Sequence, residues 1–252
     1  MSDAGDAAFT IDCAPPFLTA RFAEPQRTLG WSLLHPGFSI ATDVVWVEVR
    51  NSDLGPSVDP HAFLEARLAR SGLPNALAFM TSRDIRRHHL CHRHAGAVEA
   101  TCLTTVGLSN GERVGTRRAS GPHAGTINTL VHVSVPLTDG AMVEAISIVA
   151  QARTAAVIEF QEVQRGTAIT GTGTDCIVIA SPSRGEPVAW AGLHTDVGEA
   201  VGSAVYAATR DGAEQWERDF RHLAHDEVKF QKPSCSSPRS GERWGEGATR
   251  GP

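Results

Sequence analysis

Apolar side chains recur along the chain at two periods, and each period predicts one kind of element. Residues 39–50 alternate apolar and polar positions, which is typical of a strand with one buried face. Related patterns predict further strands at residues 96–108, 125–137, 176–182 and 188–192, the last two joined as a hairpin. Helical spacing predicts helices at residues 60–70, from residue 139 onward and at residues 196–217. Because strands and helices mix and a hairpin is among them, we expect an α+β domain with a mixed or antiparallel sheet covered by helices.

Composition predicts a boundary near the C-terminus. Residues 231–252 are rich in Pro, Gly, Ser and charge and contain almost nothing to bury, which predicts a disordered tail. No linker-like change in composition and no internal repeat precede this segment. We therefore expect a single domain at residues 10–230.

Composition also narrows the class of protein. The 252-residue chain is 41% hydrophobic and 20% charged, its formal net charge is −5, and no basic stripe interleaves with aromatic residues. A nucleic-acid partner is therefore not expected. No apolar run reaches the ~18 residues that a membrane span requires, and the first residues, MSDAGDAAFT, do not resemble a secretory signal. The five cysteines are widely spaced without a CxxC motif, so we expect reduced thiols in a cytoplasmic protein.

A histidine-rich stretch, HHLCHRH at residues 88–94, holds several potential zinc ligands. No CxxC or HExxH motif accompanies it, and Arg86, Arg87 and Arg93 would repel a cation. A compact zinc site usually needs ligands from a second element as well. We therefore expect a polar, solvated loop here and no functional metal.

Polar residues gather where predicted strands give way to loops or helices: GTIN at residues 125–128, GTGTDC at 171–176 and GLHTDVGE at 192–199. His194 lies just before the last helix, where free backbone N–H groups favour a developing negative charge. Glu199 follows about one turn later, away from the apolar stripe. An imidazole and a carboxylate in this arrangement can activate water or a hydroxyl and then protonate a leaving amine. The alternative is that both side chains are exposed and that Thr195 or Asp196 caps the helix.

Asp175 lies on a strand face that is otherwise apolar, together with Ile177. A carboxylate there must be paired, cap the GTGT turn, or take part in chemistry. Three neighbours are candidate nucleophiles for an amide: the hydroxyls of Thr172 and Thr174 and the thiol of Cys176. Cys176 is equally typical of a small core residue. No Lys follows the Gly-Thr pairs, so they form no Walker loop and no nucleotide cofactor is expected.

Four stretches occur in a particular order along the chain. They are TVGLSN at residues 105–110, GTINTLV at 125–131 with PLTDGAMVEAI at 136–146, GTGTDC at 171–176 and AGLHTDVGEAVGSAV at 191–205. Together they resemble the adenosylcobinamide amidohydrolase family, over nearly all of the core. The resemblance implies a corrinoid-salvage enzyme that cuts the amide joining aminopropanol to the corrin ring of adenosylcobinamide. The products would be adenosylcobyric acid, an intermediate of coenzyme B12 synthesis, and 1-amino-2-propanol.

Cleaving an amide requires a nucleophile, donors for the tetrahedral oxyanion and an acid for the departing amine. We expect His194 and Glu199 to be base and acid, and Asp175 to orient His194 or the leaving amine. The backbone of the GTGTD loop or Asn128 would bind the oxyanion. Residues expected to contact the corrin have amide, hydroxyl or aromatic side chains: Asn110, Thr126, Asn128, Thr172, Thr174 and Trp190.

Two other classes of protein stay open at this point. One binds a small-molecule corrinoid without cleaving it and would release no aminopropanol. The other is a threonine-nucleophile hydrolase acting on another amide, which would need an internal cleavage that exposes a new N-terminal threonine. No cofactor is expected for any of these classes.

Overall fold

The structure is a computed structural model that describes residues 8–55, 57–116, 125–164 and 169–230. It divides into two compact units, residues 1–218 and residues 219–252. The described part of the second unit, residues 219–230, is the C-terminal part of the last helix, Asp196–Phe230. The predicted tail at residues 231–252 lies outside the described residues, so the expected domain limits stay a prediction.

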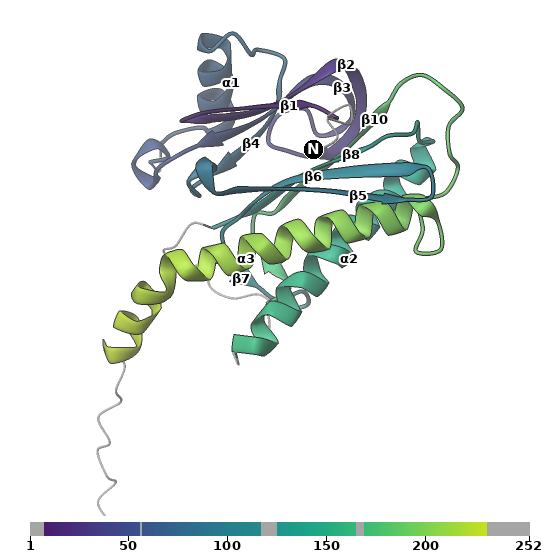
Figure 1. The fold of residues 1–252 in the computed structure, drawn as a ribbon. Coiled ribbons are helices and arrows are strands. Elements are labelled where there is room, and N and C mark those ends of the chain that lie inside the picture. The colour runs from purple at the N-terminus through teal and green to yellow at the C-terminus, as the bar shows by residue number, and fades with distance from the viewer. Residues whose placement is uncertain (1–7, 56, 117–124, 165–168, 231–252) are drawn as a thin grey trace, which may run out of the picture. The chain divides into compact units, whose positions relative to one another are not determined.

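The first unit contains a mixed eight-stranded sheet (Figure 1). Its order is β4 (Leu77–Thr81), β3 (Gly37–Glu48), β2 (Phe17–Trp31), β10 (Cys176–Pro182), β8 (Ile127–Val133), β6 (Val98–Val106) and β5 (His88–Ala95), and β1 (Thr10–Ala14) also pairs with β2. Most neighbours are antiparallel, whereas β3 with β4 and β8 with β10 are parallel. A separate antiparallel pair joins β7 (Gly111–Glu112) to β9 (Gly171–Thr172). The predicted α+β class with a mixed sheet is confirmed.

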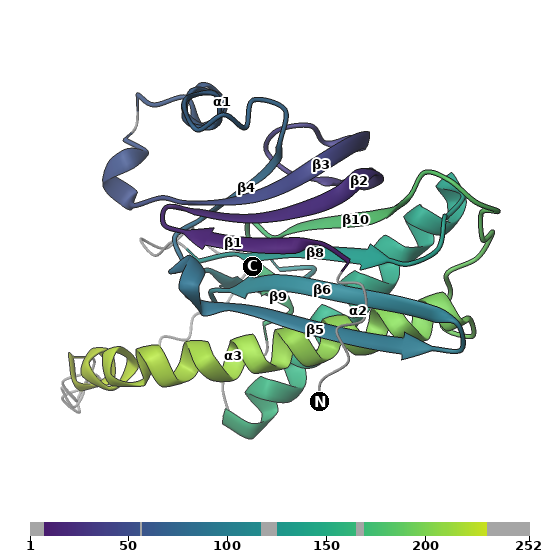
Figure 2. The same cartoon turned by 45° about the horizontal axis from the view of Figure 1, so that its top comes forward.

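The two long helices are α2 (Asp139–Gln164) and α3 (Asp196–Phe230). Helix α2 and the part of α3 that belongs to the first unit lie along one face of this sheet (Figure 2). The inward residues of α3 are mostly small, and Ala200, Ala204 and Ala208 are fully buried. Small side chains let a helix approach its neighbours closely. Thr138 caps α2, because its hydroxyl accepts a hydrogen bond from Ala141 N at 3.1 Å. Both helices begin where the sequence predicted.

The third helix, α1 (Pro60–Arg70), packs through Leu64 and Leu68 against β3 and β4. Its N-cap is Asp59, whose carboxylate accepts a hydrogen bond from His61 N at 3.0 Å, so the predicted Asp-Pro opening is confirmed. Single 3-10 turns occupy Asn51–Asp53 and Ile85–Arg87.

The face of the sheet opposite α2 and α3 is apolar as well. Residues of β2, β3 and β4 share a core with the inner faces of β6, β8 and β10. Trp46 and Phe79 are in ring contact there, with centroids 4.8 Å apart. The central strands are therefore buried on both faces, and polar groups collect at their ends.

Two sequence-based predictions about elements are wrong. Residues 188–192 do not form a hairpin with β10, because β2 and β8 already occupy both edges of that strand; Val188 makes only an isolated bridge to Leu137. The HHLCHRH stretch is not a loop but strand β5, paired antiparallel with β6. Its mostly polar side chains suit the outermost strand of the sheet.

One helix, α2, is long and apolar enough on average to span a membrane, although no uninterrupted apolar run reaches that length. Residues Asp139–Gln161 have the length and composition of such a span, 23 residues with a mean hydropathy of 1.4. In the structure, one side of this helix packs on the sheet through Met142, Ala145 and Val149. A core helix that is buried in this way can reach the same hydropathy.

Candidate active site

Most of the predicted site residues meet at the amino ends of β8 and β10. These two strands are parallel neighbours with Cys176 opposite Asn128, so the loops that precede them lie at the same edge of the sheet. The short β7–β9 pair, with Gly111 opposite Thr172, brings the turn before β7 to the same place. We call the resulting group the amino-end cluster: Asn110, Thr126, Asn128, Thr172, Thr174 and Asp175.

Asp175 is the centre of the hydrogen bonding in the GTGTD loop. Its carboxylate accepts from Thr172 N at 2.9 Å, from Ile127 N at 3.0 Å and from the Thr172 hydroxyl. It also pairs with Arg153 of α2 at 3.0 Å, and the side chains of Asp175 and Arg153 are only 7% and 13% exposed. The loop therefore contains Gly and Asp, which are unfavourable in strands, and its buried carboxylate connects β9, β8 and α2.

Thr126 and Asn128 form the buried floor of the amino-end cluster. The Thr126 hydroxyl lies 2.9 Å from the Thr174 carbonyl oxygen and 3.2 Å from Asn128 Oδ1. The Asn128 side chain donates in turn to the Met80 carbonyl oxygen at 2.8 Å. Both floor side chains are buried, and this network holds each of them in one orientation.

The rim of the amino-end cluster is open to solvent. Ser109, Gly173 and Thr174 are exposed, and Asn110 is half-buried. Gly173 N donates to the Asn110 carbonyl oxygen at 3.2 Å. A Cβ at Gly173 would lie 3.1 Å from Asn110 Nδ2, so glycine lets this amide approach the loop closely. A reacting group can thus reach the cluster from this side.

Cys176 is a poor nucleophile in this environment. Burial, with a smaller contribution from the Asp175 charge, raises the pKa of its thiol to about 11. The thiol therefore stays protonated near neutral pH, and it is the thiolate that attacks. Among the candidates next to the loop, the hydroxyls remain.

Three apolar side chains, which we call the apolar strip, run from the GTGTD loop toward the other end of β10: Trp31, Phe38 and Ile40, which are 42%, 52% and 68% exposed. The register places them on one face, because Phe38 and Ile40 lie opposite Leu29 and Arg27 of β2, and Trp31 follows Leu29 by two residues. The Trp31 indole N–H donates to the Asp175 carbonyl oxygen at 2.6 Å. A large apolar surface therefore begins at the GTGTD loop.

His194, Glu199 and Trp190 lie at the opposite end of β10. The loop that contains His194 and Trp190 follows β10, and Glu144, near the start of α2, accepts from Ala191 N in this loop at 2.6 Å. The seven residues of β10 separate this end from Asp175, roughly 20 Å at the rise of a strand. The structure thus does not bring Asp175 to His194.

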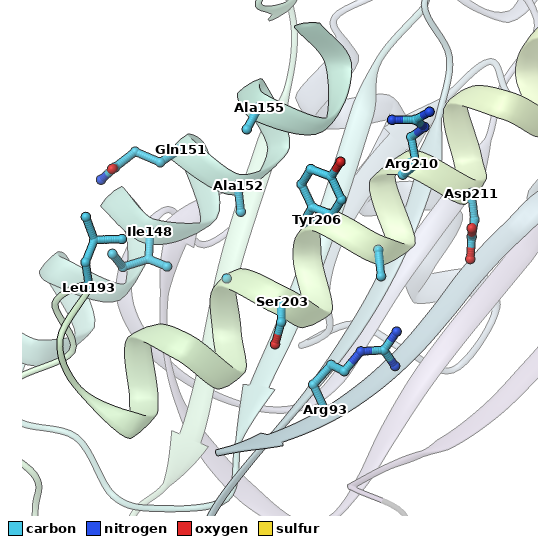
Figure 3. Close-up of a pocket in the computed structure, with 12 residues that line it drawn as sticks. Arg93, Ile148, Gln151, Ala152, Ala155, Leu193, Ser203, Tyr206, Arg210 and Asp211 are labelled. Carbon is cyan, nitrogen blue, oxygen red and sulfur yellow. The ribbon is translucent and has the colours of Figure 1, made fainter. Parts of the chain in front are cut away.

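The surroundings of His194 form a separate pocket of about 420 Å³, lined also by Glu144, Ser147, Gln151 and Trp190. His194 and Glu199 are both exposed, and neither side chain makes a hydrogen bond to another described residue. A larger groove of about 750 Å³ adjoins this pocket between α2 and α3, with Tyr206 and Arg210 along it (Figure 3). This end of the molecule has room for a ligand, but no described residue holds the side chains of His194 and Glu199 in position.

Sequence reasoning missed two charged residues, Arg153 and Glu144. Each lies in a helix, and each acts on a loop: Arg153 pairs with Asp175, and Glu144 holds Ala191. An arginine within an otherwise apolar helix was the available signal for Arg153, because a buried charge requires a partner.

Two histidines of β5 have local hydrogen-bond partners. His88 Nδ1 lies 2.8 Å from the Ile85 carbonyl oxygen, and His92 Nδ1 lies 3.0 Å from the Thr101 hydroxyl. Within the described residues, no group of three or more His, Cys, Asp or Glu side chains is placed to hold a metal ion.

Comparison with known proteins identifies the class of this protein. Residues 3–220 match the sequence profile of a family of amide hydrolases. The chain belongs to the adenosylcobinamide amidohydrolase family, as the four ordered stretches predicted.

Individual proteins match this chain either over a short stretch or at low sequence identity. The uncharacterized protein MJ1613 of Methanocaldococcus jannaschii is 41% identical over 87 residues, and the match spans 32% of this chain and only 32% of that protein. A beta-aminopeptidase from Burkholderia sp. aligns with a TM-score of 0.41 and 11% identity, over 85% of this chain and 81% of that one. The PH0078 protein of Pyrococcus horikoshii OT3 also aligns with a TM-score of 0.41, at 10% identity over 82% and 85%.

Proposed function

We propose that this protein hydrolyses the amide between aminopropanol and the corrin ring of adenosylcobinamide, giving adenosylcobyric acid and 1-amino-2-propanol. The family match over residues 3–220 carries this proposal. Water is the only co-substrate, because amide hydrolysis needs no ATP. The corrinoid is a small-molecule partner, and the reaction serves cobinamide salvage.

We place the reaction at the amino-end cluster, because catalytic groups must be held in position before the substrate arrives. Thr126 and Asn128 are buried and hydrogen-bonded, whereas the rim of the cluster is open. The corrin ring is large and flat, and the apolar strip, which begins with Trp31 at the GTGTD loop, offers a surface of matching character. In this arrangement, Asn110 and the exposed Thr174 hydroxyl are donors for the oxyanion.

His194 and Glu199 remain a second candidate centre. The observation that favours them is the pocket of about 420 Å³ in which His194 lies together with Trp190 and Glu144. As base and acid they would act at the mouth of α3, without help from Asp175.

One set of assays tests the reaction and separates the two centres. Purified protein is incubated with adenosylcobinamide, and the products are followed by chromatography. If the substrate is bound but stays intact, the protein is a corrinoid-binding protein and the proposed function is wrong.

Two variants then locate the chemistry. At the amino-end cluster, Asn110→Ala should lower the rate about 10²-fold or more, the usual effect of losing an oxyanion donor. His194→Ala should leave most of the rate. A loss of ~10²–10⁴-fold in His194→Ala would move the reaction to the mouth of α3. Asn75→Ala, at an exposed position, is the matched control.

A further inference from the structure

We propose that Thr126 cleaves the Gly125–Thr126 peptide bond and that the new N-terminal Thr126 is the nucleophile of the amide hydrolysis; the second half rests on the proposed function. The starting point is a hydroxyl without a base. Among the described residues, the Thr126 hydroxyl contacts only the Thr174 carbonyl oxygen and Asn128 Oδ1, and neither atom takes a proton near neutral pH. A threonine becomes a nucleophile when an adjacent base removes its proton, and the α-amino group of an N-terminal threonine is such a base. Thr126 acquires this group only if the bond before it is cut.

The surroundings of Gly125 suit this cleavage. A Cβ at Gly125 would lie 2.9 Å from both Ser109 N and Asn110 N and 3.0 Å from the Gly107 carbonyl oxygen, so only glycine fits here. The two amide groups make no backbone hydrogen bond to another described residue. Both N–H groups therefore lie beside Gly125 and are available as donors during the cleavage.

The carbonyl group of the bond to be cut already has a donor of its own. The Thr174 hydroxyl donates to the Gly125 carbonyl oxygen at 3.4 Å. This contact tightens as negative charge grows on the oxygen, because hydrogen bonds to charged acceptors are shorter and stronger. The GTGT turn thus acts on the bond that precedes Thr126.

The cleavage balances with one water molecule. Thr126 Oγ1 adds to the Gly125 carbonyl carbon, the C–N bond breaks, and the nitrogen takes up the proton from the hydroxyl. The resulting ester between Gly125 and Thr126 Oγ1 is hydrolysed to a Gly125 carboxylate and a free Thr126 with its hydroxyl and amine.

The second reaction uses the same atoms on the substrate. The amine of Thr126 takes the hydroxyl proton while Oγ1 attacks the corrinoid amide carbon. The proton passes to the nitrogen of aminopropanol, which leaves, and an ester links the corrinoid acyl group to Thr126. Water then cleaves this ester, releasing the corrinoid carboxylic acid and restoring Thr126.

The fold holds the new terminus in place. Ile127 N is bound by Asp175 at 3.0 Å, and the Thr126 carbonyl oxygen accepts from Gly107 N at 3.0 Å. Asp175 is itself fixed by Arg153. We therefore assign Asp175 as a positioning residue for Thr126. Strand β8 lies between β6 and β10, so the two fragments stay together in one sheet.

The test is the intact mass and N-terminal sequence of purified full-length protein, measured beside hydrolysis of adenosylcobinamide. The wild type should consist of two fragments, one beginning with Thr126. Thr126→Ser should still be cut and active, because it keeps a hydroxyl on the first residue. Thr126→Ala should stay intact and lose at least 10³-fold in rate with a near-normal melting temperature, and the exposed Thr42→Ala is the control.

The outcomes separate this inference from the proposed function. An intact wild-type chain that hydrolyses adenosylcobinamide overturns the inference and leaves the proposed function standing. A chain cut before Thr126 that leaves adenosylcobinamide unchanged overturns the proposed function and keeps the cleavage. Cleavage of Thr126→Ala at the same bond shows that a contaminating protease acts there, and the inference is then wrong.

Discussion

Replacing Asp175 by Asn tests whether the buried carboxylate holds the start of β10 together. Its side chain is 7% exposed, accepts from Thr172 N and Ile127 N, and faces Arg153, which is 13% exposed. Asn keeps one acceptor oxygen, but its amide group turns an N–H donor toward another donor, and the Arg153 charge is left unpaired. Breaking a buried ion pair costs about 3–5 kcal/mol. We expect a loss of about 3 kcal/mol, or roughly 6–12 °C in melting temperature for a chain of this size.

Urea unfolding and thermal melting measure this loss. Asp139→Asn is the matched control, because that carboxylate pairs with Arg27 but is 72% exposed, and it should lose less than about 1 kcal/mol. In the double variant, Arg153→Met should recover part of the stability, since it removes the unpaired charge. If Asp175→Asn unfolds like Asp139→Asn, the carboxylate does not stabilise the loop and the reasoning is refuted.

Three further predictions follow from the site and the core. If the apolar strip binds the corrin, Trp31→Ala should raise KM for adenosylcobinamide about 10-fold in steady-state assays, with little change in kcat. A fall in kcat alone would contradict this. Burial lowers the pKa of His132 to about 4 from 6.5, so the unfolded chain takes up the proton first as the pH falls. Stability should therefore decrease by up to about 3 kcal/mol from pH 6.5 to pH 4 and then level off, and His132→Gln should flatten that part of the curve. Replacing His92 and His94 of β5 by Gln, or adding a chelator, should leave the rate near normal; a large loss together with stoichiometric zinc in the active protein would overturn this.

The sequence alone determined the elements whose signal is local. The apolar run of β10 ends at Pro182, and the Asp-Pro opening of α1 and the small-residue stripe of α3 are each readable within one segment. The glycine-rich stretches also identified the family through their residues and their order along the chain. The residue types of the amino-end cluster are therefore readable from the sequence itself.

Only the tertiary structure decided which of those residues share a site. Asp175 has its partner in Arg153 of α2, and His194 lies at the far end of β10, although Asp175 and His194 are close in sequence. The pairing of β10 with β2 also replaced the expected hairpin, because strands join across long sequence separations according to topology and register. A local pattern records which face of a segment is buried. It does not record which distant segment covers that face, and the parallel pairing of β8 with β10 is what brings Thr126 to the GTGTD loop.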